Sequence, residues 1–339
     1  MSESSSAPQD EAGLDDALRR LGLLGAQASA RWTPLTGGVS SDIWRVDLPG
    51  RSVCVKRARS ILAVEAEWHA PVERSDFEVA WLEAARRIAP DAVPHLLGHL
   101  PDAHLFVMDY LEPSRYPIWK SELAAGRVDD VFAARVGGVL GDFHAGFAGD
   151  AELAKRFATD DLFESLRIEP YLRSTAEIHR DLAPRLEWLA ERTANTRRTL
   201  VHGDISPKNI LVGPKGPVFL DAECAWYGDP AFDVAFCLNH LLLKCCWIPA
   251  HRDDYLASYD AFRSSHAACV SWEPAEEFET RVATLLPALL LARVDGKSPA
   301  DYLEPNDRDF VRRVSQGLLS EPELDLDVIR DIWLRSLTQ

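Results

Sequence analysis

The sequence lacks the features of a membrane, secreted or disulfide-linked protein. It has no run of about 18 uncharged apolar residues, and its first residues, MSESSSAPQDEAG, lack the basic-then-apolar pattern of a secretory signal. The 6 cysteines form no CxxC pair and mostly have apolar neighbours, which is typical of reduced, buried thiols. We therefore expect a cytoplasmic protein with neither a disulfide framework nor a zinc knuckle.

Basic residues are also few, at 37 Lys and Arg against 53 Asp and Glu, so the formal net charge is −16. A surface of this sign repels phosphate backbones, and we expect no nucleic-acid partner and no membrane partner. An acidic cleft could attract a cationic substrate, but solubility explains the same excess of acidic residues. The sequence leaves the oligomeric state open.

What is present is a chain of 339 residues, 47% of them hydrophobic, long enough for two lobes that each bury a core. No internal repeat is visible. We predict a disordered N-terminus over residues 1–12, a small N-terminal lobe over 13–110 and a larger C-terminal lobe over 111–339. The fold class is α+β, because strands dominate the first part and helices the second.

The first part reads as a small antiparallel sheet with one helix. Leucines at 14, 18 and 21 recur at helical spacing, and residues 32–56 contain a Gly-Gly turn, a Pro-Gly turn and strand-like alternation. Apolar residues over 76–89 lie at helical intervals, and HLFVMDYL afterwards is a strand-like run. Strands flanking one helix are thus expected up to the connector near 108–113.

Beyond residue 113 the pattern changes to long helices. One apolar stripe covers 132–147, and further helical stretches cover 231–247, 274–294 and 325–337. Within this part, NILVGPKGPVFLDAE reads as two short strands joined by a turn from Gly213 to Gly216. This hairpin brings Asp221 back towards Asn209.

The segments HGDISPKN and FLDAE carry the groups that phosphoryl transfer requires. That reaction needs a cradle for phosphates, ligands for Mg²⁺ and a carboxylate that accepts the hydroxyl proton. Mg²⁺ takes oxygen ligands, which Asn209 and Asp221 can supply. Asp204 precedes Asn209 by one turn of loop, so the two side chains can reach different atoms of one reaction.

These two segments, in this order, resemble the catalytic loop and metal-binding motif of protein-kinase-like enzymes. More narrowly, the chain resembles the aminoglycoside phosphotransferase and choline kinase superfamily over residues 32–295. Protein kinases have Arg and Lys where this chain has Gly203 and Ser206, a change that small-molecule kinases tolerate. The segment AWYGDPAFDVAF also resembles the stretch that follows the metal-binding Asp in these enzymes.

The resemblance implies a bilobal protein-kinase-like fold and an ATP- and Mg²⁺-dependent small-molecule kinase, with ATP or another nucleoside triphosphate as donor. Asp204 would be the catalytic base, and Asn209 and Asp221 would bind Mg²⁺. Glu223 completes an Asp-x-Glu motif that resembles methylthioribose kinases, where this Glu also faces the metal.

The N-terminal lobe would bind the nucleotide. Lys56 matches the strand lysine that holds the α- and β-phosphates, and Glu78 would pair with it, with Glu73 and Glu83 as nearby alternatives. The backbone from Met108 to Tyr110 would bind adenine. TGGVSSD occupies the position of the phosphate-covering loop without a full GxGxxG pattern. Its candidate residues are Gly37, Gly38, Ser40 and Ser41.

Two further pairs have less direct roles. His202 and Asp233 would serve as scaffold that holds the catalytic loop. Arg293 and Asp295 lie where the C-terminal helices of such enzymes line the acceptor pocket, although Arg and Asp at a helix end are also ordinary caps.

Alternatives to an active kinase are a metal hydrolase using His202 and Asp204, and a catalytically inactive nucleotide-binding protein of the same fold. The hydrolase lacks further ligands at suitable spacing, and the inactive protein is disfavoured because the base and the metal ligands are present. The acceptor stays open. An aminoglycoside would suit an acidic cleft, whereas Asp-x-Glu and WKSELAAGRVDD favour a sugar resembling methylthioribose.

Overall fold

Two units divide the chain, Met1–Tyr116 and Pro117–Gln339, in a computed structural model that describes residues 11–35, 41–59 and 71–337. The division comes after Tyr116 rather than after the predicted residue 110. The intervening residues form a turn of the first unit, since the N–H groups of Arg115 and Tyr116 both donate to the carbonyl oxygen of Glu112 at 2.9 Å. Glu112 in turn lies 3.7 Å from Arg45. Most of the predicted disordered segment 1–12 lies outside the described residues.

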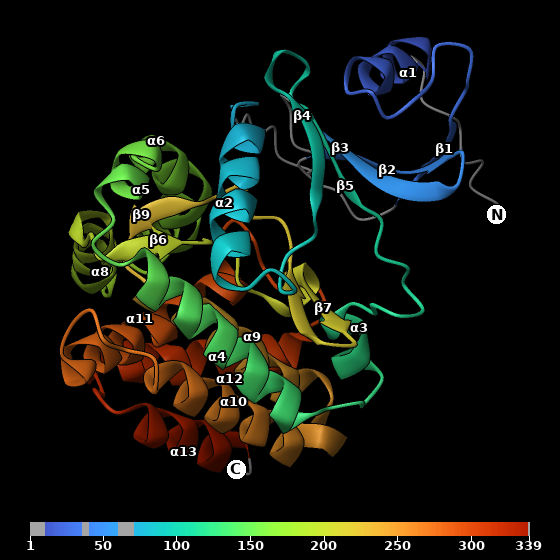
Figure 1. The fold of residues 1–339 in the computed structure, drawn as a ribbon. Helices are drawn as coiled ribbons and strands as arrows, with labels where there is room; N and C mark the ends of the chain where they lie inside the picture. The colour runs from blue at the N-terminus through green and yellow to red at the C-terminus, as the bar shows by residue number, and fades with distance from the viewer. Residues whose placement is uncertain (1–10, 36–40, 60–70, 338–339) are drawn as a thin grey trace. The chain divides into compact units, whose positions relative to one another are not determined.

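In its described residues, the first unit contains a five-stranded antiparallel sheet, the α-helices α1 and α2 and a short 3-10 helix (Figure 1). The strand order is β1-β2-β3-β5-β4, so the predicted small antiparallel sheet is confirmed. The elements are α1 (Glu11–Arg20), β1 (Arg31–Pro34), β2 (Ser41–Leu48), β3 (Arg51–Ala58), α2 (Arg74–Ile88), β4 (Leu96–Leu100), η1 (Pro101–Ala103) and β5 (Leu105–Asp109).

The two faces of this sheet carry different kinds of side chain. Val53 and Val55 of β3 belong to a buried apolar cluster that includes Leu14 and Leu18 of α1. Successive side chains of a strand point to opposite faces, so Lys56 lies on the other face, where it contacts Glu78 of α2. One face therefore builds the core, and the other presents a charged pair.

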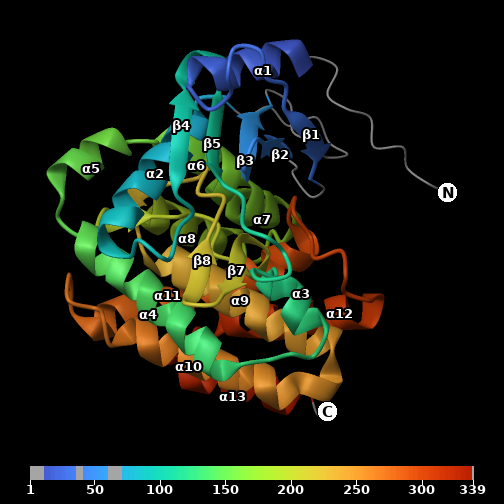
Figure 2. The same ribbon diagram turned by 45° about the vertical axis from the view of Figure 1, so that its right-hand side comes forward.

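The second unit is mainly helical (Figure 2). Its helices are α3 (Trp119–Ala124), α4 (Asp130–Phe147), α5 (Ala151–Arg156), α6 (Asp160–Phe163), the π-helix η2 (Glu164–Arg173), α7 (Ser174–Ile178), α8 (Ala183–Asn195), η3 (Pro207–Asn209), α9 (Ala231–Trp247), η4 (Pro249–His251), α10 (Arg252–Ala267), α11 (Ala275–Asp295), α12 (Pro305–Ser320) and α13 (Leu326–Leu337). Its strands form two pairs, β6 (Thr199–Val201) with β9 (Trp226–Gly228) and β7 (Ile210–Gly213) with β8 (Gly216–Phe219). The predicted helices near 132–147, 231–247, 274–294 and 325–337 are all confirmed to within two residues.

Helix α9 forms the centre of this unit. It packs against α10 and α11, while α10 and α4 run side by side in both views (Figures 1 and 2). Every residue from Ala231 to Cys246 is buried. The β7–β8 hairpin is confirmed, with Gly213 opposite Gly216 across the predicted turn. It packs on α4 and returns the chain to the segment that precedes it.

The cysteines are free thiols, and all except the partly exposed Cys269 are buried, as expected from their neighbours. Of the helices described, none taken singly has the length and apolar character to cross a membrane, although the bent pair Ala231–Trp247 and Pro249–Ala267 passes on length and composition together.

Candidate active site

The loop HGDISPKN is held in place by a buried carboxylate of α9. Asp233, with 0% of its surface exposed, accepts hydrogen bonds from the backbone N–H groups of His202 and Gly203, both at 2.8 Å. The His202 ring accepts from the N–H of Asp204 at 3.2 Å and donates to the carbonyl oxygen of Leu220 at 3.1 Å. Burial lowers the pKa of His202, against the opposing effect of Asp233, so the ring is neutral in this network.

The backbone conformation at position 203 explains why this loop has glycine where protein kinases have Arg. The φ of Gly203, +81°, lies in the left-handed region, which residues with a Cβ rarely adopt. A Cβ here would also lie 2.6 Å from the carbonyl oxygen of Cys224. The backbone therefore requires glycine at this position.

Asp204 is buried and is contacted by two cations. Its Oδ2 lies 3.1 Å from Nη2 of Arg167 and 3.2 Å from Nζ of Lys208. Arg167, on the π-helix η2, also donates through Nε to the carbonyl oxygen of Gly203. Burial alone would raise the pKa of Asp204, but Lys208 and Arg167 outweigh it and hold that pKa below its ordinary value. The carboxylate is thus ionised and fixed in orientation.

Neither cation was assigned a role in the chemistry from the sequence, and Lys208 was expected only to shape the turn of the loop. Arg167 is 37 residues away from Asp204 along the chain, and no motif marks it. A π-helix inside an α-helical region often accompanies a functional site, but its widened turn has no sequence signature here. Lys208 is part of the loop motif itself, so its position next to Asp204 was the available signal.

The expected metal ligands lie beside this carboxylate. Nδ2 of Asn209 donates to the carbonyl oxygen of Asp204 at 3.1 Å, which leaves its Oδ1 as the atom that could bind a metal. Asp221 follows β8 and has a φ of +69°, a strained conformation for a residue other than glycine. It is close enough to Asp204 to act on its pKa. Glu223 is partly buried nearby in the chain.

This donor set fits Mg²⁺ rather than a transition metal. Its atoms are amide and carboxylate oxygens, which hard cations prefer. Within 11–35, 41–59 and 71–337, no group of three or more His, Cys, Asp and Glu side chains could hold a metal by itself. Mg²⁺ usually takes one or two carboxylates plus phosphates and waters, so a site completed by a nucleotide is consistent with this finding.

In the first unit, the structure pairs Lys56 with Glu78. Nζ of Lys56 lies 2.9 Å from Oε1 and 2.7 Å from Oε2, and both side chains are buried. Glu73 and Glu83, the two alternatives, are exposed. A buried ammonium held by both oxygens of one carboxylate has a fixed position, as a phosphate-binding lysine requires.

The other nucleotide-binding candidates are less fully described. Ser41 is the buried first residue of β2, paired with Ala58, so it belongs to a strand rather than a loop. Met108 is buried in β5, and Tyr110 follows that strand with its ring 4.9 Å from the Arg45 guanidinium. Gly37, Gly38 and Ser40 lie outside the described residues.

A cavity within the second unit opens onto Asp204. It brings together the loop after β6, the start of α3, the middle of α9 and the end of α11. The lining residues are Lys120, Tyr171, Asp204, Pro207, Lys208, Phe236, His240, Lys244, Arg293, Ser298, Asp301 and Tyr302. Four of these are Lys or Arg and two are Asp, so the cavity is basic although the chain is acidic. This lining does not support the alternative of an acidic cleft that attracts a cationic substrate.

Of the two acceptor-site candidates, the structure places Arg293 but not Asp295 in the cavity lining. Arg293 lines the cavity. Asp295 does not: its carboxylate accepts hydrogen bonds from Arg312 at 2.7 Å and lies 2.8 Å from Nε2 of His179. These contacts join the end of α11 to α12 and to the residue after α7, so Asp295 has a structural role.

The profile of the phosphotransferase enzyme family matches residues 31–265, which is more than half of the chain. The chain belongs to the phosphotransferase enzyme family. The match includes Lys56 and the segments HGDISPKN and FLDAE, so the resemblance identified from the sequence is confirmed.

Curated relatives of this phosphotransferase-family protein include a methylthioribose kinase of Yersinia enterocolitica. The two are 29% identical over 230 residues, which cover 60% of this chain and 57% of the relative. The chain thus spans less than two thirds of the length of that relative.

Two solved structures share the fold. A choline kinase from Cryptosporidium parvum is 11% identical, with a TM-score of 0.55, over 91% of this chain and 96% of the other. An amicoumacin kinase solved with AMP-PNP, Ca²⁺ and Ami is 12% identical, with a TM-score of 0.53, over 94% and 98%. The protein-kinase-like fold is therefore confirmed, whereas identities this low say nothing about the substrate.

Proposed function

We propose that this protein transfers the γ-phosphoryl group of ATP to a hydroxyl of a small molecule, with Mg²⁺ as cofactor. The observation that carries the proposal is the buried, ionised Asp204, fixed by Arg167 and Lys208 at the edge of a cavity and next to Asn209. Membership of a phosphotransferase family supports the same activity.

Asp204 would accept the acceptor's proton. As the hydroxyl oxygen bonds to the γ-phosphorus, the bond from that phosphorus to the bridging oxygen breaks, ADP leaves with that oxygen, and the hydroxyl proton moves to Asp204. A fixed base contributes about a hundred- to ten-thousandfold in rate. Its fixed orientation matters more than its basicity, because the low pKa makes it a weak base for an unactivated alcohol.

The remaining residues would bind the nucleotide and the metal. Asn209 and Asp221 supply oxygens for Mg²⁺, with Glu223 as a further candidate, and Mg²⁺ when bound neutralises charge on the phosphate oxygens. Lys56, held by Glu78, binds the α- and β-phosphates. Gly37, Gly38 and Ser40, which lie outside the described residues, stay predicted phosphate-binding residues, whereas Ser41 lies buried in β2. The backbone from Met108 to Tyr110 would bind adenine. His202 and Asp233 hold the loop.

A second candidate within this activity is a sugar kinase resembling methylthioribose kinase. The relative from Yersinia enterocolitica and the Asp221-x-Glu223 motif favour it over an aminoglycoside kinase. A catalytically inactive nucleotide-binding protein is disfavoured because the base and its supporting cations are in place.

A screen of ATP consumption across amino sugars, pentoses, amino alcohols and macrolides tests the proposal. We expect ATP turnover that requires both Mg²⁺ and an acceptor, and we expect Asp221→Asn to abolish Mg²⁺-dependent nucleotide binding measured by calorimetry. Lys297→Met is a matched control, since this exposed lysine pairs with Glu169 and is absent from the cavity lining. Unchanged Mg·ATP affinity in Asp221→Asn would contradict the metal assignment.

A further inference from the structure

Three cations from three separate elements line the cavity beside Asp204 without a carboxylate partner. They are Lys120 at the start of α3, Lys244 near the end of α9 and Arg293 near the end of α11. In the described part of the chain, no carboxylate oxygen lies within ion-pair distance, 4.0 Å, of any of them. The remaining lysine of the lining, Lys208, is paired with Asp204.

Lys244 is the most unusual of the three. It is 1% exposed, and its Nζ lies 3.9 Å from the ring centroid of Tyr302 and 4.3 Å from that of Trp247. Burial, with the nearby charges of Lys120 and Arg293, lowers the pKa of Lys244 to about 7. A lysine is rarely buried unless it is paired. Its retention in an apolar helix thus points to a partner that the protein chain does not supply.

Polar atoms around the same cavity also lack partners. Nη1 of Arg293 donates to Ser298, but its Nε is buried without a hydrogen-bond partner among the described residues. The hydroxyl of Tyr302 is also buried without a hydrogen-bond partner in the described chain. Burial raises the pKa of Tyr302 to about 12, so this hydroxyl keeps its proton. Buried donors are nearly always satisfied in native proteins. In the part of the chain that the structure describes, two buried donors without partners and one ammonium without a carboxylate partner thus belong to residues that line one cavity, which points to missing acceptor oxygens.

We propose that the acceptor carries an oxyanion, a carboxylate or a phosphate, which binds Lys120, Lys244 and Arg293 while its hydroxyl faces Asp204. This inference rests on the proposed function, because it assigns the acceptor class of the same site. An oxyanion satisfies cations and neutral donors together, with charge-assisted hydrogen bonds. An amine-bearing acceptor would instead add a positive charge to a cavity that already has an excess of them.

The rival explanation is that these cations bind the phosphoryl group being transferred. Experiment separates the two explanations. Removing a cation that binds the acceptor changes KM for the acceptor, whereas removing a cation that binds the nucleotide changes the affinity for Mg·AMP-PNP. Inorganic sulfate added to the protein saturated with Mg·AMP-PNP probes the oxyanion site while the nucleotide site is filled.

We expect calorimetry to show sulfate binding under these conditions, weakened at least tenfold by Lys244→Met and by the more exposed Lys120→Met, but not by Lys297→Met. Affinity for Mg·AMP-PNP should stay within twofold in all three variants. Failure to bind Mg·AMP-PNP would refute the proposed function. Normal nucleotide binding with no sulfate binding, or with binding equal in all variants, would overturn only the oxyanion site.

Turnover then distinguishes the two oxyanion sources. D-Ribonate and D-ribose 5-phosphate carry a carboxylate and a phosphate, with D-ribose as the neutral and D-glucosamine as the cationic comparison. We expect kcat/KM for one of the two anions to exceed that of both comparisons at least tenfold, and Lys244→Met to remove this preference through KM. A preference for the neutral or cationic sugar that is unchanged in Lys244→Met would overturn the inference.

Discussion

At the scale of single residues, the candidate site contains charged side chains that are buried, although charged side chains normally lie at the surface. Asp204 is a buried carboxylate kept ionised by Arg167 and Lys208, and Lys244 is a buried ammonium without a carboxylate partner. The first arrangement is balanced by ion pairs. No carboxylate of the described residues offsets the burial of Lys244. This lysine should therefore lower the free energy of unfolding, as groups at functional sites often do.

Replacing Lys244 by Met should therefore stabilise the protein at neutral and lower pH. Its pKa is lowered from 10.5 to about 7, which corresponds to a cost of the order of 3–5 kcal/mol below pH 7. We expect Lys244→Met to raise Tm by about 5 °C or more at pH 6.5. The neighbouring Lys120, Arg293, Asp301 and neutral His240 remain in the variant, so the change isolates one charge.

The same substitution has a definite pH dependence. Between pH 7 and about 10, the unfolded chain keeps a proton on Lys244 that the folded chain has lost, so wild-type stability rises with pH across this window. The gain from Lys244→Met should shrink as pH rises from 7 to 10. A variant less stable than wild type at pH 6.5, by an amount that does not change with pH, would contradict this account.

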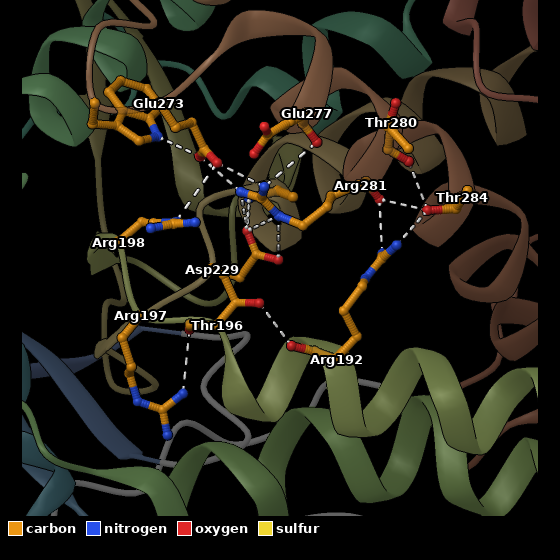
Figure 3. Close-up of polar contacts among 12 residues, drawn as sticks. Arg192, Thr196, Arg197, Arg198, Asp229, Glu273, Glu277, Thr280, Arg281 and Thr284 are labelled. Atoms are coloured by element: carbon orange, nitrogen blue, oxygen red, sulfur yellow. Dashed lines mark hydrogen bonds and ion pairs between the residues drawn. The ribbon is translucent and has the colours of Figure 1, made fainter.

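At the scale of elements, the position of the loop HGDISPKN depends on where α9 begins, because Asp233 of α9 holds the backbone of that loop. Asp229, in the Gly-Asp-Pro turn, accepts a hydrogen bond from the N–H of Ala231 at 3.0 Å at the start of that helix. Arg281 of α11 holds the same carboxylate at 3.0 to 3.2 Å and also binds Glu273 at 2.7 Å (Figure 3). This network therefore joins α11 to the helix that carries Asp233 and Lys244.

Breaking this network should destabilise the whole second unit. Asp229 and Glu273 are 0% and 2% exposed, so Arg281→Met leaves two buried carboxylates without their shared cation. We expect a loss of about 3–5 kcal/mol in the free energy of unfolding, measured by urea denaturation.

The matched control is Arg127→Met. Arg127 pairs with Glu122 on the surface, with 63% of its side chain exposed, and should cost less than about 1 kcal/mol. Equal losses in the two variants would show that burial of the Arg281 network does not matter.

Elements were predictable where one physical rule dominates. The helices predicted near 132–147, 231–247, 274–294 and 325–337 follow from their apolar residues, and the β7–β8 hairpin follows from two apolar runs around a turn. Helices α8, α10 and α12 were not predicted from the sequence. The predicted boundary after residue 110 and the division after Tyr116 differ because a local turn at Glu112, which has no strong sequence pattern, keeps residues up to Tyr116 with the first unit.

At the scale of the whole molecule, the order of motifs identified the family, but composition did not predict the charge of the cavity beside Asp204. A net charge of −16 describes the surface, whereas the cavity is lined by four Lys and Arg and two Asp. Lys120, Lys244 and Arg293 meet only through tertiary packing, and no local spacing connects them. One signal was available: Lys244 interrupts the apolar run HLLLKCCW, where a lysine needs a reason.

The proposed role of Asp204 as the base of a phosphoryl transfer is tested by comparing the transfer rates of wild type and Asp204→Asn. Transfer from ATP to the best acceptor of the panel is followed by ³¹P NMR under saturating Mg·ATP. We predict a kcat about a hundred- to ten-thousandfold lower in Asp204→Asn, with Mg·AMP-PNP affinity within twofold of wild type. A rate within threefold of wild type would contradict the account.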